Sequence, residues 1–307
     1  ICSSDAAIAL IDYLGGAPQA GGTWTGPGGW GMSGTLDPAI DASGVYSYTL
    51  LPNGPCPSAT ATVTVTIAQA VSSGLDGTLA LCSSAAAPAS LFGALGGSPA
   101  AGGAWTAPDG SPHGPTFAAA ADQPGVYTYL VQGTAPCPAA SSTVDVTVTP
   151  APSAGIGGSV ALCANEPAVD PFDWLAGSPE TGGAWTGPGG PVAIPIDPLT
   201  APSGAYTYTV PGAAPCPAAQ AVIQLTVDQL PQAGADGILN ICADGPSTNL
   251  VGLLSGAQSG GTWAGPSGTA SGTFSPGSDI PGTYTYLLYG TGACAGAFDQ
   301  ATVAVTV

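Results

Sequence analysis

Eight cysteines divide the 307-residue sequence into four consecutive copies of one unit. The first cysteine of each copy follows the previous first cysteine by 80, 81 or 79 residues. The pairs in chain order are Cys2 with Cys56, Cys82 with Cys137, Cys163 with Cys216, and Cys242 with Cys294. A unit of about 80 residues is long enough to bury its own core. The chain is therefore predicted to form four domains, at 1–70, 71–151, 152–230 and 231–307.

Each copy repeats the same order of aromatic and apolar residues. A tryptophan follows a Gly-Gly pair, an apolar residue comes next, and a Tyr-x-Tyr pair ends eight residues before the second cysteine. Closing segments such as ATVTVTI (61–67) alternate apolar and polar residues, which is the period of a strand with one buried face. The repeated residues are Trp24, Trp105, Trp185 and Trp263; Leu36, Phe117, Ile196 and Phe274; and Tyr46 and Tyr48, Tyr127 and Tyr129, Tyr206 and Tyr208, Tyr284 and Tyr286.

These patterns predict an all-β fold, with a sandwich of about seven short strands in each unit. A tryptophan strand between two cysteines resembles an immunoglobulin domain, although the second cysteine stands in a PCP or ACA turn. We therefore expect a tandem array of four Ig-like β-sandwich domains, with the four tryptophans in their cores. One disulfide in each domain is expected to tie its first strand to its terminal hairpin, as Cys2–Cys56, Cys82–Cys137, Cys163–Cys216 and Cys242–Cys294. A zinc or redox site would need closer cysteine pairs.

The glycine-rich run GGTWTGPGGW (21–30) has two interpretations. A phosphate-binding loop would open a helix and would usually have a lysine nearby. Neither is found here, whereas Gly-Pro-Gly-Gly after a core tryptophan is typical of a tight turn. The run is predicted to be a turn.

The charge composition excludes several classes of function. The chain has no Lys or Arg and 18 Asp plus Glu, for a formal net charge of −18. Nucleic-acid binding needs cationic side chains to neutralise phosphates, and anionic membrane surfaces would repel this chain. No apolar run reaches the length of a transmembrane helix, so no membrane insertion is expected. Eight paired cysteines indicate an oxidising compartment, so the predicted location is extracellular.

A few residues fall outside the repeat pattern and are candidates for binding. Trp30 and Trp174 have no counterparts in the other copies, and each could stack on a sugar ring or extend a core. Asp76 and Asp236 lie near domain junctions, where calcium could bind. Gly157 replaces the acid in the segment that leads into the third repeat, and Asp-Gly is also an ordinary turn, so no cofactor or metal is assigned.

The only histidine, His113, lies in a glycine- and proline-rich loop of the second copy, and no other copy has one. A Ser–His–acid site would need a nucleophile-elbow sequence, and the chain has none. His113 is interpreted as a surface residue. No catalytic residue is predicted, and the chain is not expected to be an enzyme.

Several motifs together resemble one group of proteins. They are the linker PxAGxDGxLxIC (231–242), the run LxGxPxxGGTWTGPGG (14–29) and the hairpin GxYTYxxxGxxPCP (204–217). They look like the Ig-like or PKD-like repeats of giant cell-surface adhesins and gliding-motility-associated proteins of Bacteroidota, which the type IX secretion system exports. The resemblance implies a cell-attached structural protein of the adhesin, filament or stalk type.

Two functions are compatible with the sequence. In the first, the chain is a structural repeat segment of a long extracellular adhesin, stalk or filament, and it holds adhesive parts away from the cell. In the second, the repeats themselves bind surface glycans or self-assemble into a polymeric fibre. The expected partners are neighbouring repeats of the same or identical chains, together with glycans in the second case.

Overall fold

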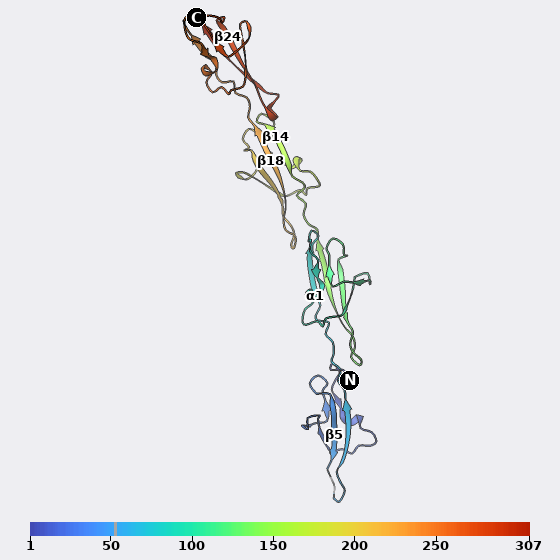
Figure 1. Ribbon diagram of the computed structural model, residues 1–307. Coiled ribbons are helices and arrows are strands. Elements are labelled where there is room, and N and C mark those ends of the chain that lie inside the picture. The colour runs from blue at the N-terminus through green and yellow to red at the C-terminus, as the bar shows by residue number, and fades with distance from the viewer. Residues whose placement is uncertain (52–53) are drawn as a thin grey trace. The chain divides into compact units, whose positions relative to one another are not determined.

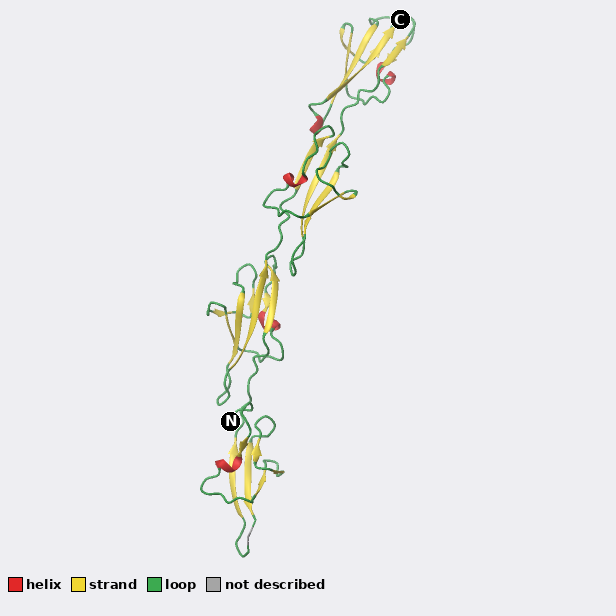
Figure 2. Cartoon of the chain, turned by 180° about the vertical axis from the view of Figure 1, so that it is seen from behind, coloured by secondary structure: helices red, strands yellow, loops and turns green. Residues whose placement is uncertain are grey.

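The computed structural model describes residues 1–51 and 54–307, and it divides into two compact units. Unit 1 comprises Ile1–Pro150 and Ala214–Cys216, and unit 2 comprises Ala151–Ala213 and Pro217–Val307. Each unit contains two separate hydrophobic cores. Strands dominate both units, and the helices are single short turns (Figure 2). No helix in the described residues is long and apolar enough to cross a membrane.

Unit 1 contains the strands of the first two repeats (Figure 1). The first repeat has β1 (Ile8–Ala9), η1 (Leu10–Tyr13), β2 (Thr23–Thr25), β3 (Gly31–Met32), β4 (Thr35–Leu36), β5 (Gly44–Leu50) and β6 (Ala59–Val65). The second has β7 (Gly77–Cys82), β8 (Ala89–Ser90), α1 (Leu91–Ala94), β9 (Ala104–Thr106), β10 (Pro112–His113), β11 (Thr116–Phe117), β12 (Gly125–Val131) and β13 (Ala140–Thr149).

Unit 2 contains the strands of the third and fourth repeats. The third repeat has β14 (Gly158–Cys163), η2 (Pro171–Trp174), β15 (Ala184–Gly187), β16 (Gly190–Pro191), β17 (Gly204–Val210) and β18 (Ala219–Asp228). The fourth has β19 (Gly237–Asn240), β20 (Thr248–Asn249), η3 (Leu250–Leu253), β21 (Thr262–Gly265), β22 (Gly268–Ala270), β23 (Thr273–Phe274), β24 (Gly282–Tyr289), η4 (Gly292–Cys294) and β25 (Phe298–Thr306).

The sheet order is that of an immunoglobulin-like sandwich. In the second repeat the order is β10-β9-β12-β13-β7, and β8 pairs with β11 in a separate two-stranded sheet. Strands β9, β12 and β13 thus stand where C, F and G lie in an immunoglobulin domain, and β8 with β11 stands where B and E lie. The third and fourth repeats have the corresponding five-stranded sheets. The predicted all-β, Ig-like tandem fold is confirmed.

The first strand of a repeat lies parallel to the last strand of the same repeat. Strand β7 pairs in parallel with β13, β14 with β18, and β19 with β25. In the first repeat an isolated parallel bridge joins Cys2 to Ala68. The two parallel strands therefore end together at one end of the sheet.

Each repeat has a tyrosine corner, a recurring feature of immunoglobulin-like sandwiches. The hydroxyl of the first tyrosine in each Tyr-x-Tyr pair donates to the backbone carbonyl four residues upstream. These bonds are Tyr46 to Ala42, Tyr127 to Gln123, Tyr206 to Pro202 and Tyr284 to Ile280. Burial raises the pKa of all four tyrosines.

The second tyrosine of each pair stands where immunoglobulin domains of antibodies carry the core cysteine of strand F. Its ring packs on the core tryptophan, with centroids 5.0 Å apart for Trp24 and Tyr48 and 5.1 Å apart for Trp185 and Tyr208. The Tyr208 hydroxyl accepts from Gly183 N at 2.8 Å and donates to Glu180 O at 2.7 Å. A Trp–Tyr pair thus fills the centre of the sandwich, and the cysteines lie elsewhere.

Candidate functional site: disulfide joints between successive repeats

The cysteines fall into two kinds by position. Strand cysteines are the first of each repeat, Cys2, Cys82, Cys163 and Cys242, and hairpin cysteines are the second, Cys56, Cys137, Cys216 and Cys294. In the structure, a strand cysteine forms a disulfide with the hairpin cysteine of the following repeat. The three disulfides are Cys2–Cys137, Cys82–Cys216 and Cys163–Cys294. The Cα–Cα distance is 4.8 Å in each. The predicted pairing within each repeat, Cys2–Cys56, Cys82–Cys137, Cys163–Cys216 and Cys242–Cys294, is wrong.

The parallel pairing of first and last strands explains this correction. Cys82 pairs with Thr149 at the end of β13, whereas Cys137 lies just before the start of that strand at Ala140. The ten residues of β13 span about 30 Å at roughly 3.3 Å per residue. A disulfide needs Cα atoms within about 7 Å. Cys82 therefore cannot reach Cys137 in the folded repeat, and Cys216 takes its place.

The three joints share one local structure. The hairpin sulfur packs against the backbone carbonyl of the residue that pairs with the strand cysteine. These contacts are Cys137 Sγ to Ala68 O at 3.3 Å, Cys216 Sγ to Thr149 O at 3.3 Å, and Cys294 Sγ to Asp228 O at 3.2 Å. The paired residues are Cys2 with Ala68, Cys82 with Thr149, and Cys163 with Asp228. A disulfide sulfur carries no proton, so these are packing contacts.

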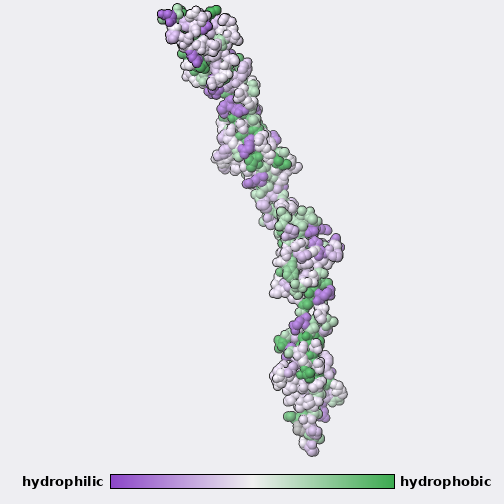
Figure 3. All heavy atoms as spheres, in the orientation of Figure 1, coloured by the Kyte–Doolittle hydropathy of each residue, from purple (hydrophilic) through white to green (hydrophobic). Residues whose placement is uncertain are grey.

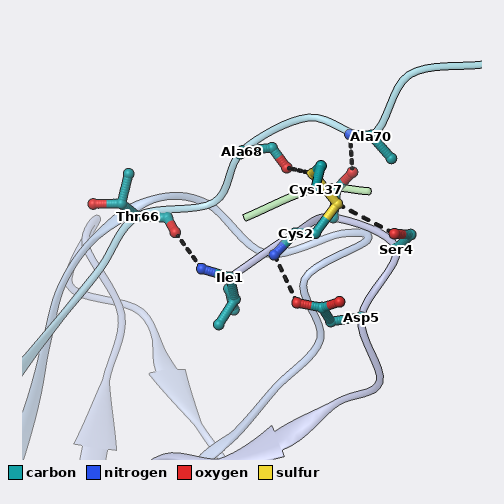
Figure 4. The surroundings of a disulfide bond; sticks show 9 residues. Ile1, Cys2, Ser4, Asp5, Thr66, Ala68, Ala70 and Cys137 are labelled. Atoms are coloured by element: carbon teal, nitrogen blue, oxygen red, sulfur yellow. Dashed lines mark hydrogen bonds between the residues drawn. A yellow bond between two sulfur atoms is a disulfide. The ribbon is translucent and has the colours of Figure 1, made fainter. Parts of the chain in front are cut away.

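A tight turn follows the strand cysteine and fixes its position (Figure 4). Cys2 N donates to the Asp5 carboxylate at 2.7 Å, and Asp5 N donates to Cys2 O at 3.0 Å. Ser4 Oγ lies 3.2 Å from Cys2 Sγ. On the linker side, Ala70 N donates to the Ser3 hydroxyl at 2.9 Å. The turn therefore holds both the disulfide and the linker that runs beside it.

Two cysteines take part in no disulfide in the described structure. Cys56 and Cys242 are both free and exposed, whereas the six bonded cysteines are at most 6% exposed. Cys56 is a hairpin cysteine of the first repeat, and Cys242 is a strand cysteine of the fourth. Their counterparts in the other repeats are each bonded to a cysteine of an adjacent repeat.

The candidate aromatic residues have different surroundings. Trp24, Trp105 and Trp185 are buried, and Trp263 packs partly buried against the fourth core. Trp174 packs, partly buried, against the third core. Trp30 is 44% exposed, and its ring lies over Gly26, where an added Cβ would meet it at 2.6 Å. The structure therefore leaves Trp30 as the exposed candidate for stacking.

The candidate calcium ligands have backbone partners. The carboxylate of Asp76 accepts from Thr143 N, and that of Asp236 accepts from Thr302 N, each at 2.7 Å. At the equivalent Gly157, a Cβ would collide with the backbone of Val222. Within the described residues, no group of three or more His, Cys, Asp or Glu side chains could hold a metal ion. The two aspartates do not come together with further acidic ligands.

His113 is half-buried rather than fully on the surface. Its side chain is 17% exposed, and Nε2 lies 3.5 Å from the Asp122 carboxylate. The ring meets Tyr127 edge-on at a centroid distance of 4.9 Å, and Nδ1 lies 2.9 Å from Gly114 O. These contacts give the side chain a packing role in its loop.

Comparison with known proteins finds matches among solved structures only. No family model and no curated protein matches the sequence. Solved structures that match include immunoglobulin domains 1–5 of Sidekick-1 (13% identity, TM-score 0.28, covering 93% of this chain and 72% of that chain) and the I-band fragment I67–I69 of titin (14%, 0.40, 76% and 97%). The N-terminal four Ig domains of Dscam1 isoform 7.44 also match (10%, 0.30, 93% and 91%). The immunoglobulin-like assignment rests on the strand order and tyrosine corners described above.

Proposed function

We propose that this chain is a structural repeat segment of a long extracellular adhesin, stalk or filament, attached to a bacterial cell surface. The observation that carries the proposal is the covalent bonding of successive repeats. The motif resemblance to Bacteroidota adhesins, gliding-motility proteins and type IX secretion substrates supports it. The domain boundaries 1–70, 71–151, 152–230 and 231–307 belong to the same proposal.

The disulfides create two covalent paths that run along the array. Each hairpin cysteine is followed 26 residues later by the next repeat's strand cysteine, as Cys137 is by Cys163. One path therefore runs from Cys2 across its disulfide to Cys137, along the backbone to Cys163, and across the next disulfide to Cys294. The second path runs from Cys56 to Cys82, across to Cys216, and on to Cys242. We call these two paths the rails.

The rails consist largely of chain that is already extended. Between Cys137 and Cys163 lie the ten residues of β13 and the six of β14, joined by a linker. The remainder of each repeat, such as the chain from Cys82 to Cys137, connects one rail to the other. Unfolding that part adds no length between the ends of the array as long as the disulfides are intact. Such an array resists extension under tension, which suits a stalk.

Single-molecule stretching between residues 1 and 307 tests this function. With the disulfides intact, the shortest covalent path contains about 40 residues, which at about 3.5 Å per residue reaches about 140 Å. Full reduction frees all 307 residues and raises the limit to about 1,070 Å. We expect no unfolding steps of whole-repeat length before reduction and several after it. Whole-repeat steps in the oxidised chain would refute the inextensible stalk.

Trp30 supports a second candidate, in which the repeats bind surface glycans. Its ring is 44% exposed and has no counterpart in the other repeats. Aromatic rings with an exposed face can stack on apolar sugar faces. A glycan array with the wild-type chain and a Trp30→Ala variant tests this candidate. Loss of a signal in the variant would support glycan binding, and absence of any signal from the wild type would dismiss it.

A further inference from the structure

We infer that Cys242 and Cys56 are the two complementary halves of one more joint, so that a second copy of this chain can be bonded head to tail through a Cys242–Cys56 disulfide. The inference rests on the proposed role of the chain as a segment of a serial array. It assigns a covalent assembly site to each end of the second rail. The ligand at either site is the complementary cysteine of another repeat of this kind.

The strand half of the joint is already formed around Cys242. Gly245 N donates to Cys242 O at 2.9 Å, as Asp5 N does to Cys2 O at 3.0 Å and Ala85 N to Cys82 O at 3.0 Å. The turn that positions the three bonded strand cysteines therefore also exists here. Strand β19 leads into it in parallel with β25, as β7 does with β13. Strand β19 ends at Asn240, two residues before Cys242, whereas β7 ends at Cys82 itself. The Cys242 thiol is exposed.

The hairpin half is formed around Cys56. Gly54 and Pro55 form a turn directly before Cys56, and the chain re-enters a strand at Ala59. A two-residue turn also comes directly before Cys137 and Cys216, and a strand again begins three residues after each cysteine. The backbone of the turn differs, because Gly54 has a φ of 71°, whereas Ala135 and Ala214 precede cis prolines. Those two hairpins reach the preceding repeat and are bonded there. Cys56 occupies the corresponding position of its hairpin and is exposed.

Three occupied joints show which partner these two halves accept. Every disulfide in the described structure joins one strand cysteine to one hairpin cysteine, and none joins two of a kind. Cys242 is of the first kind and Cys56 of the second. The pairing rule that the chain obeys internally therefore selects Cys242 with Cys56 over either symmetric pair.

The bond forms by thiol–disulfide exchange with a small disulfide oxidant such as oxidised glutathione. The Cys242 thiolate attacks one glutathione sulfur, which forms a mixed disulfide and releases one glutathione thiol. The Cys56 thiolate of the second copy then attacks the Cys242 sulfur and displaces the other glutathione thiol. Two protein thiols are oxidised to one disulfide, and the oxidant takes up the two electrons and two protons.

A mixing experiment with two single-cysteine variants tests the inference. Cys56→Ser retains only Cys242 as a free thiol, and Cys242→Ser retains only Cys56. One variant is labelled with ¹⁵N, and both are mixed in a glutathione redox buffer at about 0.15 M salt, which limits repulsion between chains of charge −18. Mass spectrometry of the linked peptides counts the three possible dimers. Peptide mapping checks that the three internal joints stay intact.

With the two variants mixed in equal amounts, random pairing of the thiols makes about half of the dimers Cys242–Cys56 heterodimers; we expect this heterodimer to make up nearly all of them. The wild-type chain in the same buffer should form a ladder of oligomers linked only by Cys242–Cys56 peptides. A statistical mixture with the two symmetric dimers, or thiols that stay as glutathione adducts, overturns the inference. Neither result bears on the stretching experiment, which depends on the Cys2–Cys137 and Cys163–Cys294 bonds.

Discussion

Cys82 is bonded to Cys216, although Cys137 is the cysteine that follows it within its own repeat. Cys82 and Thr149 are register partners, so the bond lies beside the point where β13 leaves the repeat. The junction between the two repeats is thereby crossed twice, once by the peptide linker and once by sulfur.

A cut in a linker should not separate the chain. Because the sequence has no Lys or Arg, Gln69→Lys creates the only tryptic site, at an exposed position of the first linker. After trypsin, we expect one band on a denaturing gel without reductant and two with it, because Cys2–Cys137 spans the cut. Adding Cys2→Ser to the same variant should yield two bands without reductant. Two bands from Gln69→Lys alone without reductant would mean that Cys2 is not bonded to Cys137.

The second glycine of each Gly-Gly pair, two residues before the core tryptophan, should tolerate no side chain. A Cβ on Gly183 would lie 2.5 Å from the Tyr208 ring, whereas one on Gly189 would meet nothing within 4 Å. We expect Gly183→Ala to reduce the free energy of unfolding by about 1–3 kcal/mol, as overpacking does. Gly189→Ala should change it by less than about 0.5 kcal/mol. Denaturant unfolding followed by tryptophan fluorescence measures both, and equal effects would contradict the Trp–Tyr core.

Stability should fall at alkaline pH because of the tyrosine corners. Burial raises the pKa of the Tyr206 hydroxyl above its ordinary value of 10.0. The neutral hydroxyl is therefore favoured by folding, and the unfolded chain ionises first. This contribution is fully present below pH 10 and is lost as the pH rises through the raised pKa of the folded state. Thermal melts followed by circular dichroism from pH 8 to 12 should show the melting temperature falling as the pH rises. Tyr206→Phe should make this fall less steep, and an unchanged pH dependence in the variant would contradict the role of the tyrosine corner.

Calcium should not stabilise the chain beyond its effect on ionic strength. The Asp76 carboxylate is already an acceptor for Thr143 N. We expect Asp76→Ala to cost about 1 kcal/mol of stability through the lost hydrogen bond, while the exposed Asp145→Ala, which removes the same charge, has a smaller effect. Thermal melts in CaCl₂ and in NaCl of equal ionic strength should coincide for the wild type. A higher melting temperature in calcium that Asp76→Ala abolishes would establish a calcium site instead.

Much of the fold can be predicted from the sequence because the signals are local and occur four times. Alternation in ATVTVTI indicates a strand with one buried face, and β6 forms over Ala59–Val65. The Tyr-x-Tyr pair indicates two side chains on one face, and Tyr46 and Tyr48 both point into the core. The cysteine pairing could not be predicted in the same way. It depends on the parallel pairing of the first and last strands, a feature of the tertiary structure that places Cys82 and Cys137 at opposite ends of β13.

Residue type and spacing are enough to predict the four copies of one unit, the strands, the core tryptophans and the lack of a basic surface. The choice of disulfide partner was decided only by tertiary structure. Cys2, Cys82 and Cys163 could each pair with the hairpin cysteine of their own repeat or with that of the next repeat. Closing the longer loop costs only about 0.8 kcal/mol more in chain entropy. So small a difference cannot select a partner. The selection comes from the folded sheet, which holds Cys82 about 30 Å from Cys137 and brings it to a Cα–Cα distance of 4.8 Å from Cys216.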